Sequence, residues 1–130
     1  MLRTKSVHSP IETKADGLRI LVARLRGHGL TKDRYDVWMA NLGPSEKLLR
    51  ELQNGKVSWT EFRRRYHDEL FEGGTIDSRN RTIKNHGQKF TLRLLQHLAR
   101  SQTVTLLCHC AEDEARCHRY VLEAILEAKV

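Results

Sequence analysis

The side chains best suited to chemistry lie together near the C-terminus of the chain. All three cysteines, Cys108, Cys110 and Cys117, fall within ten residues, and His118 and Arg119 follow the last of them. A thiolate is a nucleophile, and the pKa of a thiol falls at a helix N-terminus or beside a cation. Because a helix is predicted to begin at Cys117, one interpretation is a thiol-dependent enzyme with Cys117 as nucleophile and His118 as its general base; it is the alternative to the ligand-binding site described below.

The same residues suggest a metal site as an alternative. Cys108, Cys110, Cys117 and His118 would form a Cys3His set, which tetrahedral zinc accepts. Strand alternation places Cys108 and Cys110 on one side, which favours this site. The side chains of the adjacent Cys117 and His118 would diverge by about 100° on a helix, which argues against a shared metal site. The other interpretation is three reduced cysteines without a cofactor, Cys108 being a small buried apolar residue.

A phosphatase-type loop is a further interpretation of this stretch. Arg116 follows Cys110 at the required spacing, between a predicted strand and a predicted helix. The interior of such a loop would carry the acidic run 112–114, which would repel a phosphate dianion, and it has no glycine for a nest of amides. The sequence therefore does not favour phosphatase chemistry.

Cationic side chains predict a site for a phosphate-bearing ligand. The net charge is +7, and Arg24, Arg26 and His28 follow a predicted strand, while Arg119 lies in the first turn of a predicted helix. If the two strands are parallel, their carboxyl ends share one edge of the sheet, and helix N-terminal amides there receive anions. We therefore expect a nucleotide or nucleic acid to bind at a Cys/His/Arg site at this edge. The alternative for Arg119 is an ion pair with the acidic run 112–114.

The elements that must position these residues alternate between strands and helices. Apolar and β-branched stretches predict strands at Leu2–His8, which we place at an edge of the sheet, Leu18–Leu25 and Thr103–Cys108. Apolar spacing and capping residues predict five helices: Thr31–Asn41, Ser45–Asn54, the helix capped by Ser58, Lys89–Ser101 and Cys117–Ala128. Residues 1–130 are therefore expected to form a single α/β domain, with a small, mostly parallel sheet of three or four strands flanked by helices.

Two further basic stretches have an ordinary and a functional interpretation. Arg63, Arg64, Arg65 and His67 occupy the outer face of the helix that follows Ser58; a solvated surface is favoured over a nucleic-acid contact. Residues 73–89 are basic and poor in apolar side chains, and are expected to form a loop or an arm.

Bulk composition excludes several classes of protein. No apolar run approaches the roughly 20 residues that span a bilayer, so no membrane association is expected. The basic, polar N-terminus does not resemble a secretory signal, which predicts a cytoplasmic location. An odd number of clustered cysteines argues against a disulfide framework. Neither the composition nor the motifs of the sequence indicate an oligomeric state.

Several motifs recur in an order and spacing typical of one family. They are Asp16–Val22, Arg24–Leu30, Trp38 with Pro44-Ser45, Trp59 with Glu61–Tyr66 and Glu69-Leu70, and Leu106–Cys108 with Cys117–Arg119. With these motifs the sequence resembles the family called domain of unknown function 488, in its short, YeaO-like form. The resemblance implies a small α/β domain and no established activity.

The chain departs from this family pattern at three places, one of which is the basic segment Gly73–Lys89, which has no clear counterpart in the family. Arg26-Gly27-His28-Gly29 stands where family members often have Trp-Pro-Arg-Gly, and Ala23 stands where an aspartate is common. An acidic role at position 23 is therefore not expected here.

Overall fold

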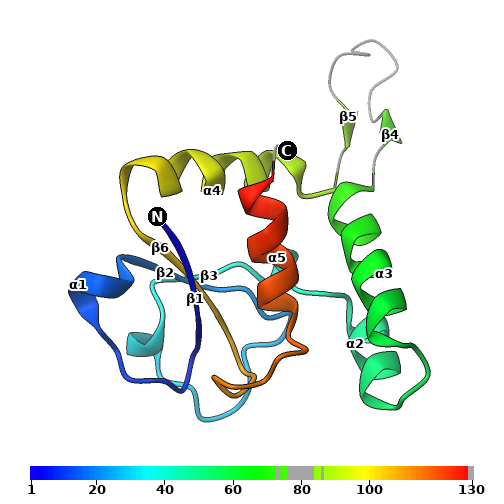
Figure 1. Ribbon diagram of the computed structural model, residues 1–130, viewed down its shortest axis with the longest axis horizontal. Coiled ribbons are helices and arrows are strands. Elements are labelled where there is room, and N and C mark those ends of the chain that lie inside the picture. Colours follow the sequence, from blue (N-terminus) through cyan, green and yellow to red (C-terminus); the bar gives the residue numbers. More distant parts are fainter. Residues whose placement is uncertain (73, 76–83, 86, 129–130) are drawn as a thin grey trace.

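The centre of the molecule is a four-stranded parallel sheet (Figure 1), seen in a computed structural model that describes residues 1–72, 74–75, 84–85 and 87–128. The strand order is β1-β6-β2-β3. The strands are β1 (Leu2–Ser6), β2 (Leu18–Leu21), β3 (Val37–Trp38) and β6 (Val104–Cys108). Every residue of β6 is buried, which explains its uninterrupted Val-Thr-Leu-Leu-Cys sequence.

Helices supply the remaining layers. They are α1 (Thr13–Asp16), α2 (Glu46–Gln53), α3 (Trp59–Phe71), α4 (Lys89–Ser101) and α5 (His118–Glu127). In Figure 1, α5 stands in front of the sheet, between the sheet and α3. The predicted α/β class, the parallel sheet and the edge position of β1 are confirmed. Among the described residues, no helix combines the length and apolar character needed to cross a bilayer.

Two apolar clusters hold these layers together. The larger cluster joins Ile20 of β2 and Leu106 of β6 to side chains of the helices, including Phe62 and Leu122. The smaller cluster contains Leu21 and Leu107 with residues from loops. Because neighbouring residues of a strand point to opposite faces, β2 and β6 contribute to both clusters and are buried on both sides.

The predicted helix caps at Ser45 and Ser58 are confirmed, whereas the side chain of Thr31, at the start of the helix predicted over residues 31–41, makes no capping hydrogen bond. The Ser45 hydroxyl accepts a hydrogen bond from the Leu48 amide at the start of α2, and the Ser58 hydroxyl accepts one from the Glu61 amide at the start of α3. The Glu61 carboxylate bonds to Arg64 and Arg65 instead of reaching back to the cap. Ser58 and Glu61 have the spacing of a capping box, and the hydroxyl half of that motif is formed.

The prediction of a helix over residues 31–41 is wrong. The segment contains a 3-10 turn at Lys32–Arg34, then β3, then a second 3-10 turn at Ala40–Leu42. The Met39 amide donates to the Leu21 carbonyl at 2.9 Å. Hydrogen bonds to the neighbouring strand thus replace the i to i−4 bonds that a helix would require.

Other predicted boundaries also shift. The strand predicted over Leu18–Leu25 ends at Leu21, and the one predicted over Leu2–His8 ends at Ser6. A short helix, α1, lies in the predicted 11–16 loop, where the buried Asp16 carboxylate accepts a hydrogen bond from the Lys5 ammonium at 3.0 Å. Within the predicted basic loop over 73–89, β4 (Gly74–Thr75) pairs antiparallel with β5 (Lys84–Asn85). The basic side chains of this loop up to position 86 lie outside the described residues.

Candidate functional site

The loops that follow β2 and β6 lie next to each other at the carboxyl edge of the sheet. His118 Nε2 is 2.7 Å from the Val22 carbonyl oxygen, and His109 Nε2 is 3.0 Å from the Leu25 carbonyl oxygen. This arrangement follows from the parallel pairing of β2 with β6. The two parts of the chain that were expected to share this edge are therefore neighbours.

The three cysteines form what we call the three-sulfur cluster, Cys108, Cys110 and Cys117. Their sulfur atoms all lie within 4.8 Å of one another, close enough to hold a metal ion, and the Sγ atoms of Cys108 and Cys117 are 2.8 Å apart. None of the three forms a disulfide. Cys108 and Cys117 are buried, whereas Cys110 is half-buried and is the thiol nearest to solvent.

Arg119 brings a buried positive charge to this cluster. Its side chain is fully buried, and Nη1 donates to Cys108 Sγ at 3.0 Å. Nη2 donates to the backbone carbonyls of Ala111 and Glu112 at 3.1 and 3.0 Å, and lies 3.4 Å from the Glu112 carboxylate. Among the described residues, Nε has no partner. The ion pair with an acid of the 112–114 run, weighed from the sequence, is therefore present alongside a contact to sulfur.

The cluster divides its protons unequally. Hydrogen bonds from Cys108 and Cys117 lower the pKa of Cys110 to about 2, and the charges of His118 and Arg119 lower it further. The same hydrogen bond to Cys110 raises the pKa of Cys108 to about 11. Hydrogen bonds to both neighbouring sulfurs and burial raise the pKa of Cys117. These shifts favour Cys110 as the first thiol of the cluster to lose its proton.

The expectation of a lowered pKa at Cys117 is wrong. Cys117 does occupy the N-cap position of α5, but its side chain makes no capping hydrogen bond. It is 1% exposed, and its hydrogen bonds to Cys108 and Cys110 favour its protonated form. Burial and the neighbouring thiols thus outweigh the helix N-terminus.

His118 holds α5 to the end of β2. A carbonyl oxygen only accepts hydrogen bonds, so Nε2 carries the proton in the contact to Val22. The imidazole is buried, its ring meets Tyr66 edge-on at 5.8 Å, and burial lowers its pKa. His118 does not belong to the group of side chains that lie close enough together to hold one metal ion. The Cys3His set is thus reduced to three cysteines.

Arg24, Arg26 and His28 are occupied differently from what the sequence suggested. Arg24 donates to the carbonyls of Gly43 and Pro44 at 2.7 and 3.1 Å. Arg26 donates to the Tyr35 hydroxyl at 2.7 Å and to a backbone carbonyl, while His28 is exposed. Within the described part of the chain, no hydrogen bond or ion pair joins these three side chains to Arg119. Arg24 and Arg26 thus hold loops in place, and binding of a phosphate group by Arg24, Arg26 or His28 stays a prediction.

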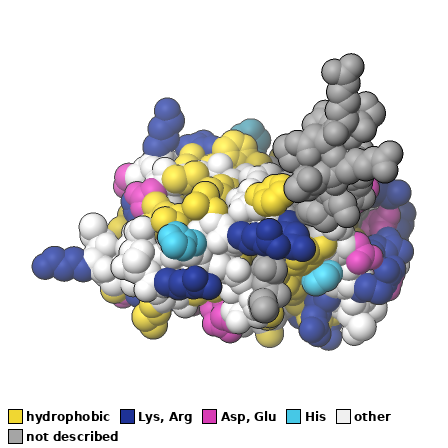
Figure 2. Space-filling model, turned by 90° about the horizontal axis from the view of Figure 1, so that it is seen from above, with side chains coloured by type: hydrophobic (Ala, Val, Ile, Leu, Met, Phe, Trp, Pro, Cys, Tyr) yellow, Lys and Arg dark blue, Asp and Glu magenta, His cyan; other side chains and the backbone are white. Residues whose placement is uncertain are grey.

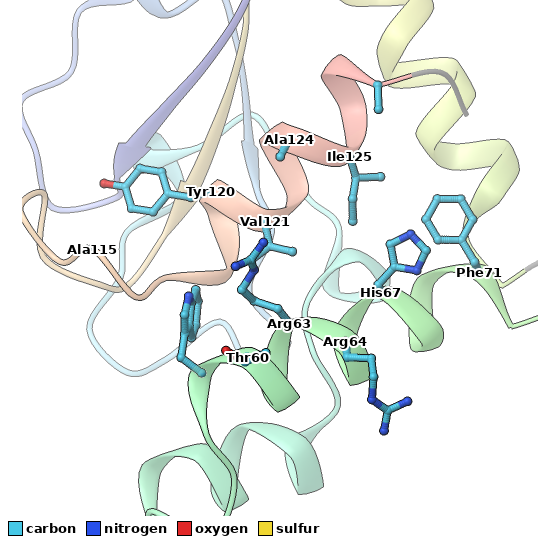
Figure 3. A pocket seen from close by; sticks show the side chains of 12 residues that line it. Thr60, Arg63, Arg64, His67, Phe71, Ala115, Tyr120, Val121, Ala124 and Ile125 are labelled. Atoms are coloured by element: carbon cyan, nitrogen blue, oxygen red, sulfur yellow. The ribbon is translucent and has the colours of Figure 1, made fainter.

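A groove between α3 and α5 was missed by sequence reasoning. It encloses about 690 Å³. Figure 3 shows Arg63, His67 and Phe71 projecting from α3 beside Val121 and Ile125 of α5. The available signal was the i, i+4, i+8, i+12 spacing of Trp59, Arg63, His67 and Phe71, which places aromatic and cationic side chains along one side of a helix.

The net charge of +7 is not gathered into one continuous patch on the face seen in Figure 2. Figure 2 shows Lys and Arg side chains dispersed among apolar, acidic and neutral side chains on the face seen from above. A local arrangement of cations, such as the one along the α3–α5 groove, is thus more informative than the net charge.

Comparison with known proteins adds a family and no activity. A family model described as "Active DUF488-N3 subclade" matches residues 2–130. The relatives found include Uncharacterized protein Mb3100c of Mycobacterium bovis and Uncharacterized protein Rv3073c of Mycobacterium tuberculosis. Each is 28% identical over 107 residues, covering 81% of this chain and 89% of the relative. No solved structure matches the chain.

Proposed function

Since the chain belongs to the DUF488 family, in the branch whose description calls it active, we propose that it is a cysteine-dependent enzyme in which Cys110 is the nucleophile. Cys108 and Cys117 act as the neighbouring thiols that hold Cys110 in its ionised form. The family brings no substrate with it, so the proposal rests on the geometry of the three-sulfur cluster.

The observation that carries the proposal is the contact of buried Arg119 with this cluster. A buried guanidinium is costly unless a negative charge lies beside it. The nearest carboxylate, that of Glu112, is half-exposed and 3.4 Å away, whereas Cys108 Sγ is buried and 3.0 Å away. One thiolate shared among the three sulfurs supplies the missing charge, and Cys110 is the member of the cluster that a substrate can approach.

The reaction class follows from a thiolate that is already ionised. A bond forms between Cys110 Sγ and an electrophilic atom of the substrate, while the bond from that atom to its leaving group breaks and the leaving group keeps the electron pair. A general base for the cysteine is unnecessary, so His118 serves as a positioning residue that fixes α5 to Val22. This role differs from the base for Cys117 that the sequence suggested.

Alkylation by iodoacetamide at graded pH tests this proposal. We expect rapid modification of Cys110, located by mass spectrometry, at a rate that is nearly constant between about pH 5 and 8. A thiol with the ordinary pKa of about 8.5 would instead react about ten times faster for each pH unit over this range. The Cys110→Ser variant should lose the fast reaction. Preferential modification of Cys117, or a steeply rising rate in the wild type, would count against Cys110 as the nucleophile.

A metal centre is a second candidate, favoured by the spacing of the three sulfurs. Three thiolates around Zn²⁺ would carry a net charge of −1, which Arg119 would balance, and the position left by His118 would be open to water or substrate. Elemental analysis of protein purified without chelator separates the candidates. One zinc per chain that is lost in Cys110→Ser would identify a metal centre, whereas metal-free protein with a fast-reacting Cys110 would identify the thiolate.

A further inference from the structure

We propose that the groove between α3 and α5 binds single-stranded nucleic acid, with bases stacked on its aromatic side chains and a phosphate bound by Arg63. This inference does not depend on chemistry at the three-sulfur cluster. It rests on the arrangement of aromatic, cationic and apolar side chains along two helices.

The aromatic side chains along α3 are held flat by neighbours. Trp59 stacks on Phe62 with ring centroids 5.2 Å apart and an interplanar angle of 14°, and His67 stacks on Phe71 at 4.5 Å and 29°. Trp59, His67 and Phe71 all line the groove. Rings fixed in this way lose little side-chain entropy when a base stacks on them, and every base offers a flat face.

The spacing of the two aromatic pairs suits a short stretch of a strand. Trp59 and His67 are eight residues apart on α3, which corresponds to about 12 Å along the helix axis. Stacked nucleotides repeat at about 3.4 Å, so this distance spans about three of them. The floor between them is formed by Val121, Ala124 and Ile125 of α5, whose small or apolar side chains leave room for a base.

Charge decides which partner fits this groove. None of the described residues that line it is acidic, and Arg63 lies between the two aromatic pairs, directed toward Val121 (Figure 3). Within the described part of the chain, Arg63 has neither a hydrogen bond nor an ion pair, whereas Arg64 bonds to Glu61 and Asp68. The guanidinium of Arg63 is therefore placed where the backbone of a stacked strand would carry its phosphates.

The groove ends beside the cysteine loop. Ala115 and Tyr120 line this end, and the Tyr120 hydroxyl accepts a hydrogen bond from Arg119 at 2.9 Å. The acidic run 112–114 precedes Ala115, so a phosphate is disfavoured at this end and favoured near Arg63. A bound strand is thus oriented with its bases along α3 and its phosphates toward the middle of the groove.

Fluorescence of Trp59 provides a direct test. The chain contains two tryptophans, so in a Trp38→Phe protein Trp59 is the sole tryptophan. We expect an oligo(dT) of about twelve nucleotides, a typical length for one binding site, to quench Trp59 emission as it binds. An oligonucleotide of the same length with abasic sites should bind at least about fivefold more weakly, because stacking on aromatic side chains is lost. Unchanged Trp59 emission at saturation, or equal affinity for the abasic strand, would overturn the proposal.

Charge reversal supplies a matched control. Arg63→Glu should weaken oligo(dT) binding by about tenfold or more at low salt, and should reduce the slope of log K against log salt by about 0.7 for each phosphate that the protein no longer neutralises. Arg50→Glu makes the same change at an exposed position on α2, away from the groove lining, and should alter affinity by less than about twofold. Equal weakening by both variants would mean diffuse attraction to the basic surface. A dimer that Arg63→Glu dissociates would mean that a second copy occupies the groove. Either result would refute nucleic-acid binding there.

Discussion

Replacing Arg119 with methionine should strongly destabilise the domain. Methionine keeps much of the side-chain length and remains apolar, but it removes every donor and the charge. The guanidinium donates to the carbonyls of Ala111 and Glu112, to the Tyr120 hydroxyl and to Cys108 Sγ, all within 3.1 Å. These contacts close the loop between β6 and α5 over the cluster.

The magnitude follows from counting what is left unpaired. Hydrogen bonds from a charged donor contribute about 1.5 to 3 kcal/mol each, but carbonyls 111 and 112 belong to exposed residues and can bond to water instead. The lasting cost is that the thiolate shared by the three-sulfur cluster loses its fully buried counter-ion Arg119, comparable to breaking a partly buried ion pair. We therefore expect a decrease of about 3 to 5 kcal/mol in the free energy of unfolding, a large part of the stability of a small domain.

Urea unfolding followed by circular dichroism in reducing buffer measures this decrease. Arg116→Met is the matched control, because Arg116 is exposed in the same loop, and it should stay within about 0.5 kcal/mol of the wild type. Slower alkylation of Cys110 near pH 5 in Arg119→Met would tie the effect to the thiolate. An Arg119→Met protein as stable as the wild type would refute the idea that a buried charge pair organises the site.

Three further substitutions probe other contacts. Burial raises the pKa of Asp16, but a backbone amide and Lys5 lower it more, so its folded pKa lies below its unfolded value and it stabilises the fold above about pH 4. This contribution is lost as the pH falls through the folded pKa, so Asp16→Asn should flatten the acid limb of a plot of unfolding free energy against pH. Ser58→Ala removes the cap of α3 and should cost about 1 kcal/mol in urea unfolding, whereas Ser58→Asp should not. Gly17→Ala should cost at least about 2 kcal/mol in the same assay, because φ is +60° and a Cβ would lie 2.2 Å from the Thr103 carbonyl oxygen.

Each of these substitutions has an outcome that would contradict its reasoning. An unchanged acid limb in Asp16→Asn would mean that other carboxylates dominate acid unfolding. Equal stability of Ser58→Ala and Ser58→Asp would mean that the cap contributes nothing measurable. A Gly17→Ala protein with wild-type stability would mean that the turn before β2 rearranges freely.

Local signals in the sequence predicted the helices that local interactions build. Ser45 and Ser58 act within their own first turns, so the starts of α2 and α3 were found correctly. Residues 31–41 have a helical apolar spacing, but their amides and carbonyls bond to β2, which lies outside that window. A pattern within the segment could not reveal a partner outside it.

The same division applies to the site. Strand alternation and the predicted start of a helix placed Cys108, Cys110 and Cys117 near one edge of the sheet, and a shared site was one of two interpretations. They could not show which thiol is ionised, because that depends on burial and on sulfur-to-sulfur hydrogen bonds. Nor could they show that Arg24 donates to the carbonyls of a distant loop.

The central position of β6 in the sheet affects how the chain folds during synthesis on the ribosome. β6 lies between β1 and β2, yet it is synthesised after almost every other element. Until it emerges, β1 and β2 lack their shared neighbour, and more than half of the polypeptide must wait with apolar strand edges exposed. Completion of the sheet thus depends on a late contact of long sequence separation, which slows folding and prolongs the exposure of unpaired strand edges.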